Sequence, residues 1–526
     1  ANKAIEDRDR GDAKDYDVMR ARSVVFPQVQ IGSRLKIRYK IKTAKPVLQG
    51  RWSTEITVAP GYFREDFQVT VNSELPLHTL TSDPRDTVTV KRPKKNKVVV
   101  IGKAKQAGWV HAEKDPYFHP DSMARVWVST ENDWAEFFRP LTTDLEKVLS
   151  AGVPKDLGDW VAQAKKKKTV PEKIGYLQER MSTEFRYFGD WRRHNGGIVP
   201  RELQEIKASR YGDCKDLSTL LTALLRALDI DARVALVRRG ENPWGREPDY
   251  RLPVLIRFNH AIVHVKDGER TYWLDPTNPV SSLMPFPDIA GRPAWLVGAD
   301  AFARLPENVS RENHYVQNFE YRFTGDDDAK VKVQVDARNM AASEIANSLM
   351  LAPRSEILSQ ILEQFSEDNE VKSFKFPREP STGRTLKDID FTLEYDTGRI
   401  TYNAGKNSFW VMPDGFLEGP FYETEERESD LRLTGEPYLI TGARRLKDMR
   451  LAQDLPAPCA VESEWMNLSR KVQVEGNDVV IHHNVELKRP FIRREEFRSA
   501  AFKELQARTK HCYLRSGVLL ESVRKR

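Results

Sequence analysis

The stretch YGDCKDLSTLLTALLRALDIDARVALV at residues 211–237 decides the fold of the central part of this chain. Its leucines recur at the spacing of one buried helix face, at positions 217, 220, 221, 224, 225 and 228. Asp213 is a suitable N-cap and Gly212 permits a tight turn before it, so we expect Cys214 in the first helical turn. A thiol there faces unpaired backbone N–H groups and the positive end of the helix dipole, which both favour the thiolate. The same N–H groups could stabilise an oxyanion, although the helix pattern taken alone favours a small buried cysteine over a reactive one.

A second stretch, FNHAIVHVKDGERTYWLDPTNP at residues 258–279, predicts a β-hairpin. If Asp267 and Gly268 form its two-residue turn, His260 lies directly opposite Asp275. Opposed side chains have Cβ atoms about 4.5–5.5 Å apart, which suits a carboxylate bonded to an imidazole. This register is an assumption, because a one-residue bulge would reverse the faces, and a His–Asp pair can serve stability alone. Together with Cys214, the pair provides the groups needed for thiol acyl transfer.

These motifs resemble a known family. YGDCKD before a leucine-rich helix, FNHAIVHV and YWLDPTNP are similar, in order and separation, to the three motifs of the bacterial transglutaminase-like superfamily, whose core is papain-like. The resemblance covers about residues 155–300. It implies that Cys214 is the nucleophile, that His260 is the general base and acid, and that Asp275 orients His260. The segment SVVFPQVQIGSRLKIRYKIK at 23–42 resembles the domain of unknown function that precedes such cores in many Gram-negative bacterial proteins.

Three aromatic residues are further candidates for the site. In this family a side chain upstream of the cysteine often supplies a second oxyanion donor, and Tyr187 and Trp191 in FRYFGDWRR are both candidates. Trp244 lies in the Pro- and Gly-rich loop 238–253, which could wall a substrate cleft or be a solvent loop with an anchoring tryptophan. His260 and His264 would lie about 13 Å apart on a strand, so we expect no metal site. No calcium loop or other cofactor motif is evident, and we expect no cofactor.

The remaining pattern predicts a multidomain α+β protein. We expect an N-terminal antiparallel, sandwich-like β domain (1–150), the papain-like core (151–305) and a C-terminal β-rich domain with helices (306–526). Strands are predicted at 32–41, 55–58, 67–71, 87–90, 98–101, 124–128, 471–474 and 479–485, and another follows the alternating valines at 331, 333 and 335. Helices are predicted from Asp133, with a kink or break at Pro140, and at 171–181, 339–351 and about 357–365. Residues 276–306 contain six prolines and are interpreted as a crossing segment between domains.

Composition excludes several classes of protein. The 526 residues carry a net charge of only +7, so we expect no nucleic-acid partner. The basic runs at 91–97 and 165–168 are interpreted as solvated surface, and the alternative is contact with an anionic partner such as a membrane of the cell envelope. Three cysteines exclude a disulfide-rich scaffold, and a disulfide between Cys459 and Cys512 stays open against two reduced, buried thiols. The chain begins at Ala1 rather than Met, so we expect a processed protein of the periplasm or secreted from a Gram-negative bacterium.

The predicted function is a cysteine enzyme that attacks an amide or peptide carbonyl through an acyl-enzyme. We expect a protein or peptide substrate, and hydrolysis rather than protein crosslinking, because many bacterial members of the family resemble peptidases or amidases. The alternative is a non-enzymatic envelope protein that binds a partner or acts as a scaffold around an inactive or occluded core. Oligomeric state is not written in the sequence.

Overall fold

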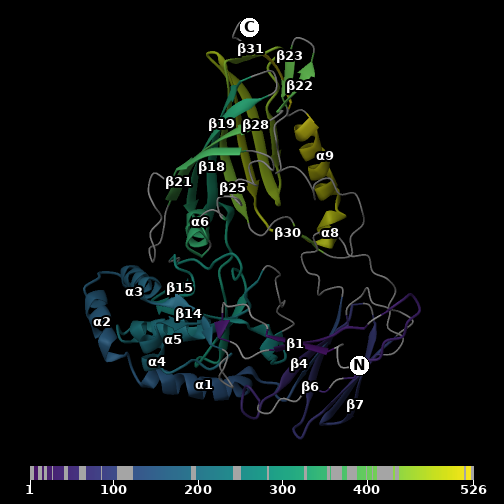
Figure 1. Cartoon of the computed structure of the whole chain (residues 1–526), viewed down its shortest axis with the longest axis vertical. Coiled ribbons are helices and arrows are strands. Elements are labelled where there is room, and N and C mark those ends of the chain that lie inside the picture. Colours follow the sequence, from purple (N-terminus) through teal and green to yellow (C-terminus); the bar gives the residue numbers. More distant parts are fainter. Residues whose placement is uncertain are drawn as a thin grey trace.

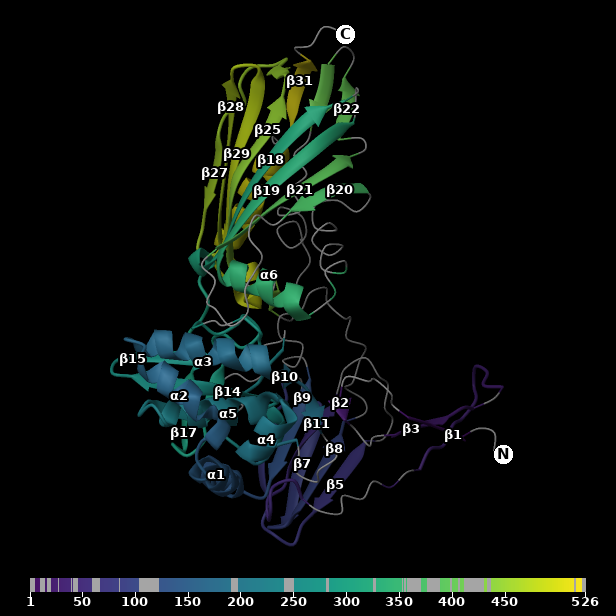
Figure 2. The same cartoon turned by 60° about the vertical axis from the view of Figure 1, so that its left-hand side comes forward.

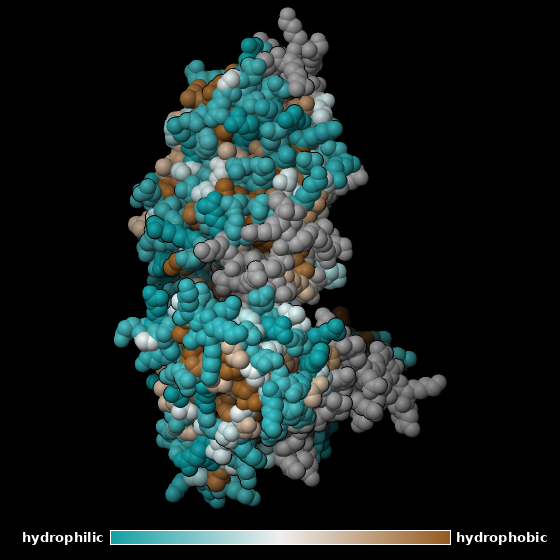
Figure 3. Space-filling view, turned by 90° about the vertical axis from the view of Figure 1, so that its left-hand side faces the viewer, coloured by the Kyte–Doolittle hydropathy of each residue, from teal (hydrophilic) through white to brown (hydrophobic). Residues whose placement is uncertain are grey.

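The computed structural model shows an elongated molecule, with a large C-terminal sheet at one end and the helical region beside the N-terminal sheets at the other (Figures 1 and 2). Its chain is α+β and multidomain, as predicted. Hydrophilic residues cover most of the face shown in Figure 3. The residues described are 5–9, 15–16, 20–26, 28–38, 40, 46–58, 67–84, 86–103, 123–190, 197–240, 250–280, 283–324, 328–351, 353, 356, 370–375, 388–397, 400–404, 407–410, 430–432, 437–514 and 517–522.

Two three-stranded antiparallel sheets form the N-terminal region. One has the order β4 (Ser53–Val58), β9 (Ala124–Ser129), β6 (His78–Ser82), and the other has the order β5 (Gln68–Asn72), β8 (Lys97–Gly102), β7 (Val88–Lys94). Apolar side chains from both sheets share one core, which includes Ile56, Val98 and Val126. The short strands predicted between residues 55 and 128 are therefore present. A separate pair, β1 (Ile5–Asp9) and β3 (Arg20–Val24), is antiparallel.

The strand predicted at 32–41 is wrong for the residues that the structure describes there. Residues 33–38 and 40 have no strand partner in the described chain. Leu35 and Ile37 are 52% and 65% exposed, so the apolar side of the alternation has no core beneath it. Alternation indicates how side chains would divide between two faces, but a strand forms only where a neighbour supplies hydrogen bonds.

Helix α1 (Trp134–Ser150) is continuous through Pro140, at which a kink or break was expected. Proline has no N–H, so the carbonyl of Glu136 lacks its usual helical donor. Arg51 Nε donates to that carbonyl at 3.0 Å and so replaces the missing bond. The buried face of α1, which includes Phe137 and Phe138, belongs to the same core as the cysteine helix.

The cysteine helix α5 (Cys214–Arg226) packs on a five-stranded antiparallel sheet. The strand order is β15 (Arg270–Leu274), β14 (His260–Asp267), β13 (Asp231–Val237), β16 (Pro293–Leu296), β17 (Ala301–Arg304). Leu220, Leu221 and Leu224 of the predicted apolar face are completely buried. Helices α2 (Gly158–Lys165), α3 (Val170–Glu184) and α4 (Leu203–Ser209) surround α5, and α3 confirms the helix predicted at 171–181.

The proline-rich segment 276–306 is more than a crossing segment, because two of its stretches are strands of the same sheet. β16 pairs with β13, and β17 extends the sheet beyond β16. Trp295 of β16 is 2% exposed and lies within the core. The six prolines obscured this, since four-residue strands between prolines carry too few positions for periodicity to show.

An eight-stranded sheet dominates the C-terminal region (Figure 2). Its order is β20 (Glu370–Lys375), β21 (Asp388–Thr397), β19 (Ala329–Asn339), β18 (Asn313–Phe323), β25 (Tyr438–Lys447), β29 (Asp478–Leu487), β28 (Met466–Glu475), β27 (Cys459–Glu462). Neighbours are antiparallel except β18 and β25, which are parallel. A smaller sheet has the order β22 (Thr401–Ala404), β23 (Asn407–Trp410), β31 (Val518–Ser522), β26 (Met449–Leu451), and β24 (Leu431–Arg432) pairs with β30 (Phe491–Ile492).

Helices close the lower end and one side of this region. α6 (Met340–Leu351) follows β19 directly, as predicted, and lies between the large sheet and the helical region (Figure 2). α8 (Arg494–Phe497) and α9 (Ala500–Leu514) lie beside the sheet. The helix predicted at about 357–365 lies outside the described residues. Among the helices that are described, none has the length and apolar character needed to cross a membrane.

Cys459 in β27 and Cys512 in α9 form a disulfide, the alternative that the sequence left open. Their Cα atoms are 5.8 Å apart, within the usual range for such a bond. Cys214 is the free cysteine. The domain boundaries expected at 150 and 305 fall at the end of α1 and just after β17, and they stay predictions.

Candidate active site

Cys214 is the first residue of α5, as the sequence predicts. The carboxylate of Asp213 caps the helix by accepting from the backbone N–H of Asp216 at 3.3 Å. A Cβ atom at Gly212 would lie 2.7 Å from the Cβ of Asp216, so only glycine fits this close approach. Cys214 itself is half-buried, which leaves part of it open to a reactant.

A buried ion pair holds the segment that leads into α5. Arg201 Nε donates to Asp216 Oδ2 at 2.7 Å, and the backbone N–H of Arg201 donates to Oδ1 at 2.9 Å. The Arg201 guanidinium also lies 4.6 Å from the ring centroid of Tyr211. Because Asp216 is in the first turn of α5, these contacts anchor the turn that carries Cys214. The sequence pattern did not identify Arg201.

Of the three aromatic candidates, Tyr187 lies among the residues that the structure describes. Tyr187 lies in β10 (Arg186–Tyr187), which pairs in parallel with β12 (Tyr211–Gly212), so Tyr187 is the register partner of Gly212. Its side chain is 53% exposed, and it lies close enough to Arg239 to affect the pKa of that guanidinium electrostatically. Trp191 and Trp244 lie outside the described residues.

His260 and Asp275 come together as predicted, although the predicted register is wrong. The last pair of the hairpin is Asp267 with Arg270, so the turn is formed by Gly268 and Glu269 rather than by Asp267 and Gly268. This moves the pairing by two residues, which keeps every side chain on its expected face. His260 Nε2 and Asp275 Oδ2 are 2.8 Å apart, and both side chains are buried.

Electrostatics favour a charged imidazole at this position. Burial lowers the pKa of His260, but the charge and hydrogen bond of Asp275, followed by a hydrogen bond with Cys214, outweigh it and raise the pKa from 6.5 to about 10. Burial likewise raises the pKa of Asp275, yet the charges of His260 and Arg239 hold that pKa well below its usual range. Since Nε2 faces Asp275, Nδ1 is the ring nitrogen left for the thiol.

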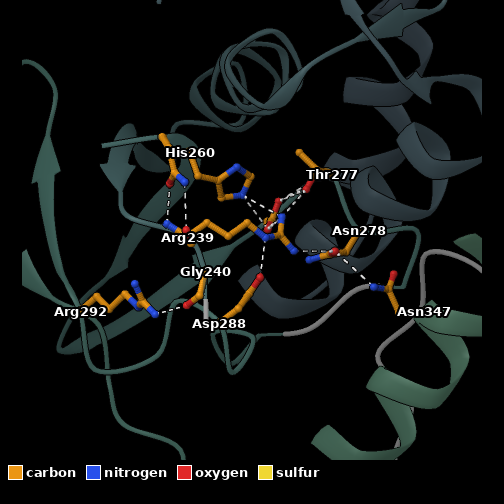
Figure 4. Close-up of polar contacts among 10 residues, drawn as sticks. Arg239, Gly240, His260, Thr277, Asn278, Asp288, Arg292 and Asn347 are labelled. Carbon is orange, nitrogen blue, oxygen red and sulfur yellow. Dashed lines mark hydrogen bonds and ion pairs between the residues drawn. The ribbon is translucent and has the colours of Figure 1, made fainter. Parts of the chain in front are cut away.

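A cluster around Arg239 supports the pair, and the sequence did not reveal it (Figure 4). Arg239 Nη1 donates to Asp275 Oδ2 at 3.1 Å and to Thr277 Oγ1 at 3.2 Å, and its Nε donates to Asp288. Nη1 is also 3.2 Å from His260 Nε2, and when Nε2 carries a proton, both donors point at the same carboxylate oxygen. Thr277 in turn donates to Asp275 Oδ1 through its hydroxyl at 2.6 Å and its backbone N–H at 3.0 Å.

The backbone of Arg239 is fixed beside the histidine. Its N–H donates to Asn259 Oδ1 at 2.6 Å, and Asn259 Nδ2 donates back to the Arg239 carbonyl at 2.9 Å. Asn259 directly precedes His260, and Val237 is the register partner of His260. Arg239 thus comes two residues after the end of β13, the strand that pairs with the His260 strand. In a sequence, the residues that follow such a strand are the first candidates for contacts with the histidine.

His264 has a different role from His260. Its ring contacts that of Trp273 at an interplanar angle of 59°, with centroids 4.7 Å apart, and burial lowers its pKa. Within the described part of the chain, no group of three or more His, Cys, Asp or Glu side chains is arranged to hold a metal ion.

Comparison with known families identifies this part of the chain. Residues 156–276 match the family model of the transglutaminase-like superfamily. The chain contains a transglutaminase-like core. Residues 1–104 match DUF3857, a domain of unknown function with a solved structure. Cys214, His260 and Asp275 lie within the transglutaminase-like match, whereas Asn278 and Asp288 lie beyond its end.

Solved structures share the fold at low sequence identity. A candidate protease from Parabacteroides distasonis has a TM-score of 0.55 and 11% identity, over 99% of this chain and 85% of that one. A candidate cysteine protease from Cytophaga hutchinsonii has a TM-score of 0.21 and 12% identity, over 48% of this chain and 84% of that one. No curated protein matches the chain. The first similarity extends the shared fold to nearly the whole chain, including the regions that flank the transglutaminase-like core.

Proposed function

We propose that this protein is a cysteine hydrolase that cleaves an amide or peptide bond, with Cys214 as nucleophile. The observation that carries the proposal is the 2.8 Å contact between His260 Nε2 and Asp275 Oδ2, beside a half-buried free thiol at a helix start. This arrangement combines an activated nucleophile, a base that can accept its proton and a carboxylate that orients the base.

The proposed reaction has two steps. The thiol proton resides on His260, and the Cys214 thiolate attacks the carbonyl carbon and forms a C–S bond. The backbone N–H groups at the start of α5 stabilise the oxyanion, and His260 gives its proton to the leaving nitrogen as the C–N bond breaks. His260 then removes a proton from water, which attacks the thioester, and the Cys214 thiolate leaves.

Hydrolysis of a protein or peptide is proposed ahead of crosslinking. The fold similarity to a candidate protease supports this choice. A periplasmic or secreted location is proposed as well, because the disulfide between Cys459 and Cys512 is typical of oxidising compartments. The exposed basic run at 165–168 is compatible with association with the cell envelope.

The test is to trap the acyl-enzyme. The full chain is incubated with peptides from a Gram-negative envelope extract and quenched in acid, and the intact protein is weighed by mass spectrometry. We expect an adduct on Cys214 that hydroxylamine removes and that the Cys214→Ala variant lacks.

The control is His260→Gln, which keeps the thiol but loses the base and should accumulate little adduct. A Cys214 that forms no adduct, and that iodoacetamide modifies only after unfolding, would contradict the proposal. That result would favour the alternative of a non-enzymatic envelope scaffold with an occluded core.

A further inference from the structure

The chain runs from Asp275, which orients His260, into the C-terminal region within a few residues. Asp275 follows the end of β15, and Val280 lies five positions later. Val280 is completely buried, in a cluster whose other fully buried members all come from β19, α6 and β21 of the C-terminal region: Ala337, Ala341, Ala342, Ala346 and Ile389. The segment therefore begins beside His260, at Asp275, and ends packed within the C-terminal region, at Val280.

A polar path joins the same helix to the site (Figure 4). Asn347 of α6 donates through Nδ2 to Asn278 Oδ1 at 3.3 Å. Asn278 Oδ1 also accepts from Arg239 Nη2 at 3.5 Å, a long contact, and Arg239 Nη1 bonds Asp275 at 3.1 Å. Asn278 is 6% exposed, so these contacts form away from bulk water.

The carboxylate of Asp288 interacts with charged groups both in the site and on α6. Asp288 pairs with Arg239, and it also acts on Glu344 of α6. Burial, together with the charge of Asp288, raises the pKa of Glu344 to about 7. The apolar, hydrogen-bonding and electrostatic contacts of α6 thus converge on residues 275–288.

We propose that α6 is a positioning element of the active site and that Val280 and Asn347 are its positioning residues. Neither touches a reacting atom. They hold the segment 275–280 so that the Asp275 carboxylate stays within hydrogen-bond distance of His260. This inference rests on the proposed function, because it assigns a role in keeping His260 charged.

The physical reason is the narrow range of a hydrogen bond. A displacement of about 1 Å would take the 2.8 Å contact between Asp275 and His260 out of that range. Pro276 and Pro279 restrict the backbone of the segment, so a shift at Val280 is transmitted toward Asp275 rather than absorbed between them. The C-terminal region would then be required for the transglutaminase-like core to work.

The test uses the full chain with Val280→Ala, Asn347→Ala and the double substitution. The pKa of His260 is measured by NMR, with its signal assigned from the His260→Gln variant, and Cys214 alkylation by iodoacetamide is followed at pH 7. We expect the double variant to lower the pKa of His260 by about one unit, a tenfold shift in its protonation equilibrium, while alkylation at pH 7 changes little because the imidazole is still protonated there. Val280→Ile, which keeps an apolar side chain at this position, should leave the pKa of His260 near its wild-type value.

The matched controls are Val335→Ala and Asn318→Ala. Val335 lies in the core of the large sheet, and Asn318 Oδ1 accepts a hydrogen bond from the backbone N–H of Ala443. They repeat the chemical changes elsewhere in the C-terminal region and should leave His260 unaffected at a similar loss of melting temperature. An unchanged His260 in the double variant, while Asp275→Asn lowers its pKa, would overturn the inference alone. A wild-type protein that forms no acyl adduct would instead overturn the proposed function.

Discussion

Replacement of Asp275 by Asn tests the electrostatic basis of the site. The substitution keeps the shape of a buried side chain but removes its charge. In the wild type the pKa of His260 rises from 6.5 to about 10. At about 1.36 kcal/mol per pKa unit, the charged imidazole is favoured by about 5 kcal/mol. Without the carboxylate, burial is the largest remaining influence, and we expect the pKa of His260 to fall below 6.5.

The assay is the rate of Cys214 alkylation by iodoacetamide between pH 5 and 10, read by intact mass. Because Cys459 and Cys512 are joined, Cys214 is the single thiol that can react. An ordinary cysteine is only about 3% ionised at pH 7, so loss of the imidazolium should cost about 30-fold in thiolate. A thiolate paired with imidazolium is a weaker nucleophile, so the expected fall in rate at pH 7 is about 10-fold.

The control is Asp267→Asn, at the end of β14 near the hairpin turn, which should alkylate like the wild type. Melting curves establish that both variants are folded. An Asp275→Asn profile that superimposes on the wild-type profile would refute the reasoning. So would a wild-type thiol that becomes reactive only above about pH 8, as an isolated thiol does.

The same pair makes a pH-dependent contribution to stability. A raised pKa in the folded state means that the contribution is complete below pH 6.5 and is lost as the pH rises to about 10. Because the proposed reaction already places the Cys214 proton on His260, folding takes up a net proton only above about pH 8.5, and urea unfolding of the wild type should give a free energy about 2 kcal/mol smaller at pH 10 than at pH 6. Asp275→Asn should remove most of this difference, and a difference of the same size in both proteins would contradict the assignment to His260.

Three other substitutions test the framework around the site. Gly212→Ala places a Cβ 2.7 Å from Asp216, and we expect a loss of about 1–3 kcal/mol in unfolding free energy and slower alkylation of Cys214. Cys512→Ser opens a disulfide that joins residues 53 positions apart, and urea unfolding should show a loss of about 2–4 kcal/mol. The rate of Cys214 alkylation, read by peptide mapping because Cys459 is then also a free thiol, should be unchanged. Thr169→Ala removes the capping box of α3, and thermal melts should show a loss of about 1 kcal/mol. The control for Gly212→Ala is Gly158→Ala, because nothing lies within 4 Å of a Cβ at that position, and the control for Thr169→Ala is Thr169→Ser. An equal loss in variant and control would contradict either expectation. The control for Cys512→Ser is the wild type treated with dithiothreitol. Disulfide loss that also slowed alkylation would contradict the expectation for Cys512→Ser.

Local periodicity was sufficient for the elements that carry the site. The leucine spacing after Cys214 predicted α5 and its buried face, because a helix repeats every 3.6 residues whatever surrounds it. The hairpin that carries His260 was predicted with its register moved by two residues. The prediction that His260 and Asp275 share a face survived this error, because side chains in a strand alternate with a period of two.

Tertiary structure alone decided which residues support that pair. Arg239, Asn278 and Asn347 come from three separate places in the chain, and each bonds the next through side chains whose meeting depends on how β13, the segment after β15 and α6 pack. The strand predicted at 32–41 was wrong because its alternation is also a local pattern: apolar residues such as Ile37 pack against no core in the described structure. The sequence by itself determined the chemical groups and the faces on which they lie, because periodicity is a local property of the backbone. The supporting contacts follow from packing between regions distant in the chain, which no local pattern records.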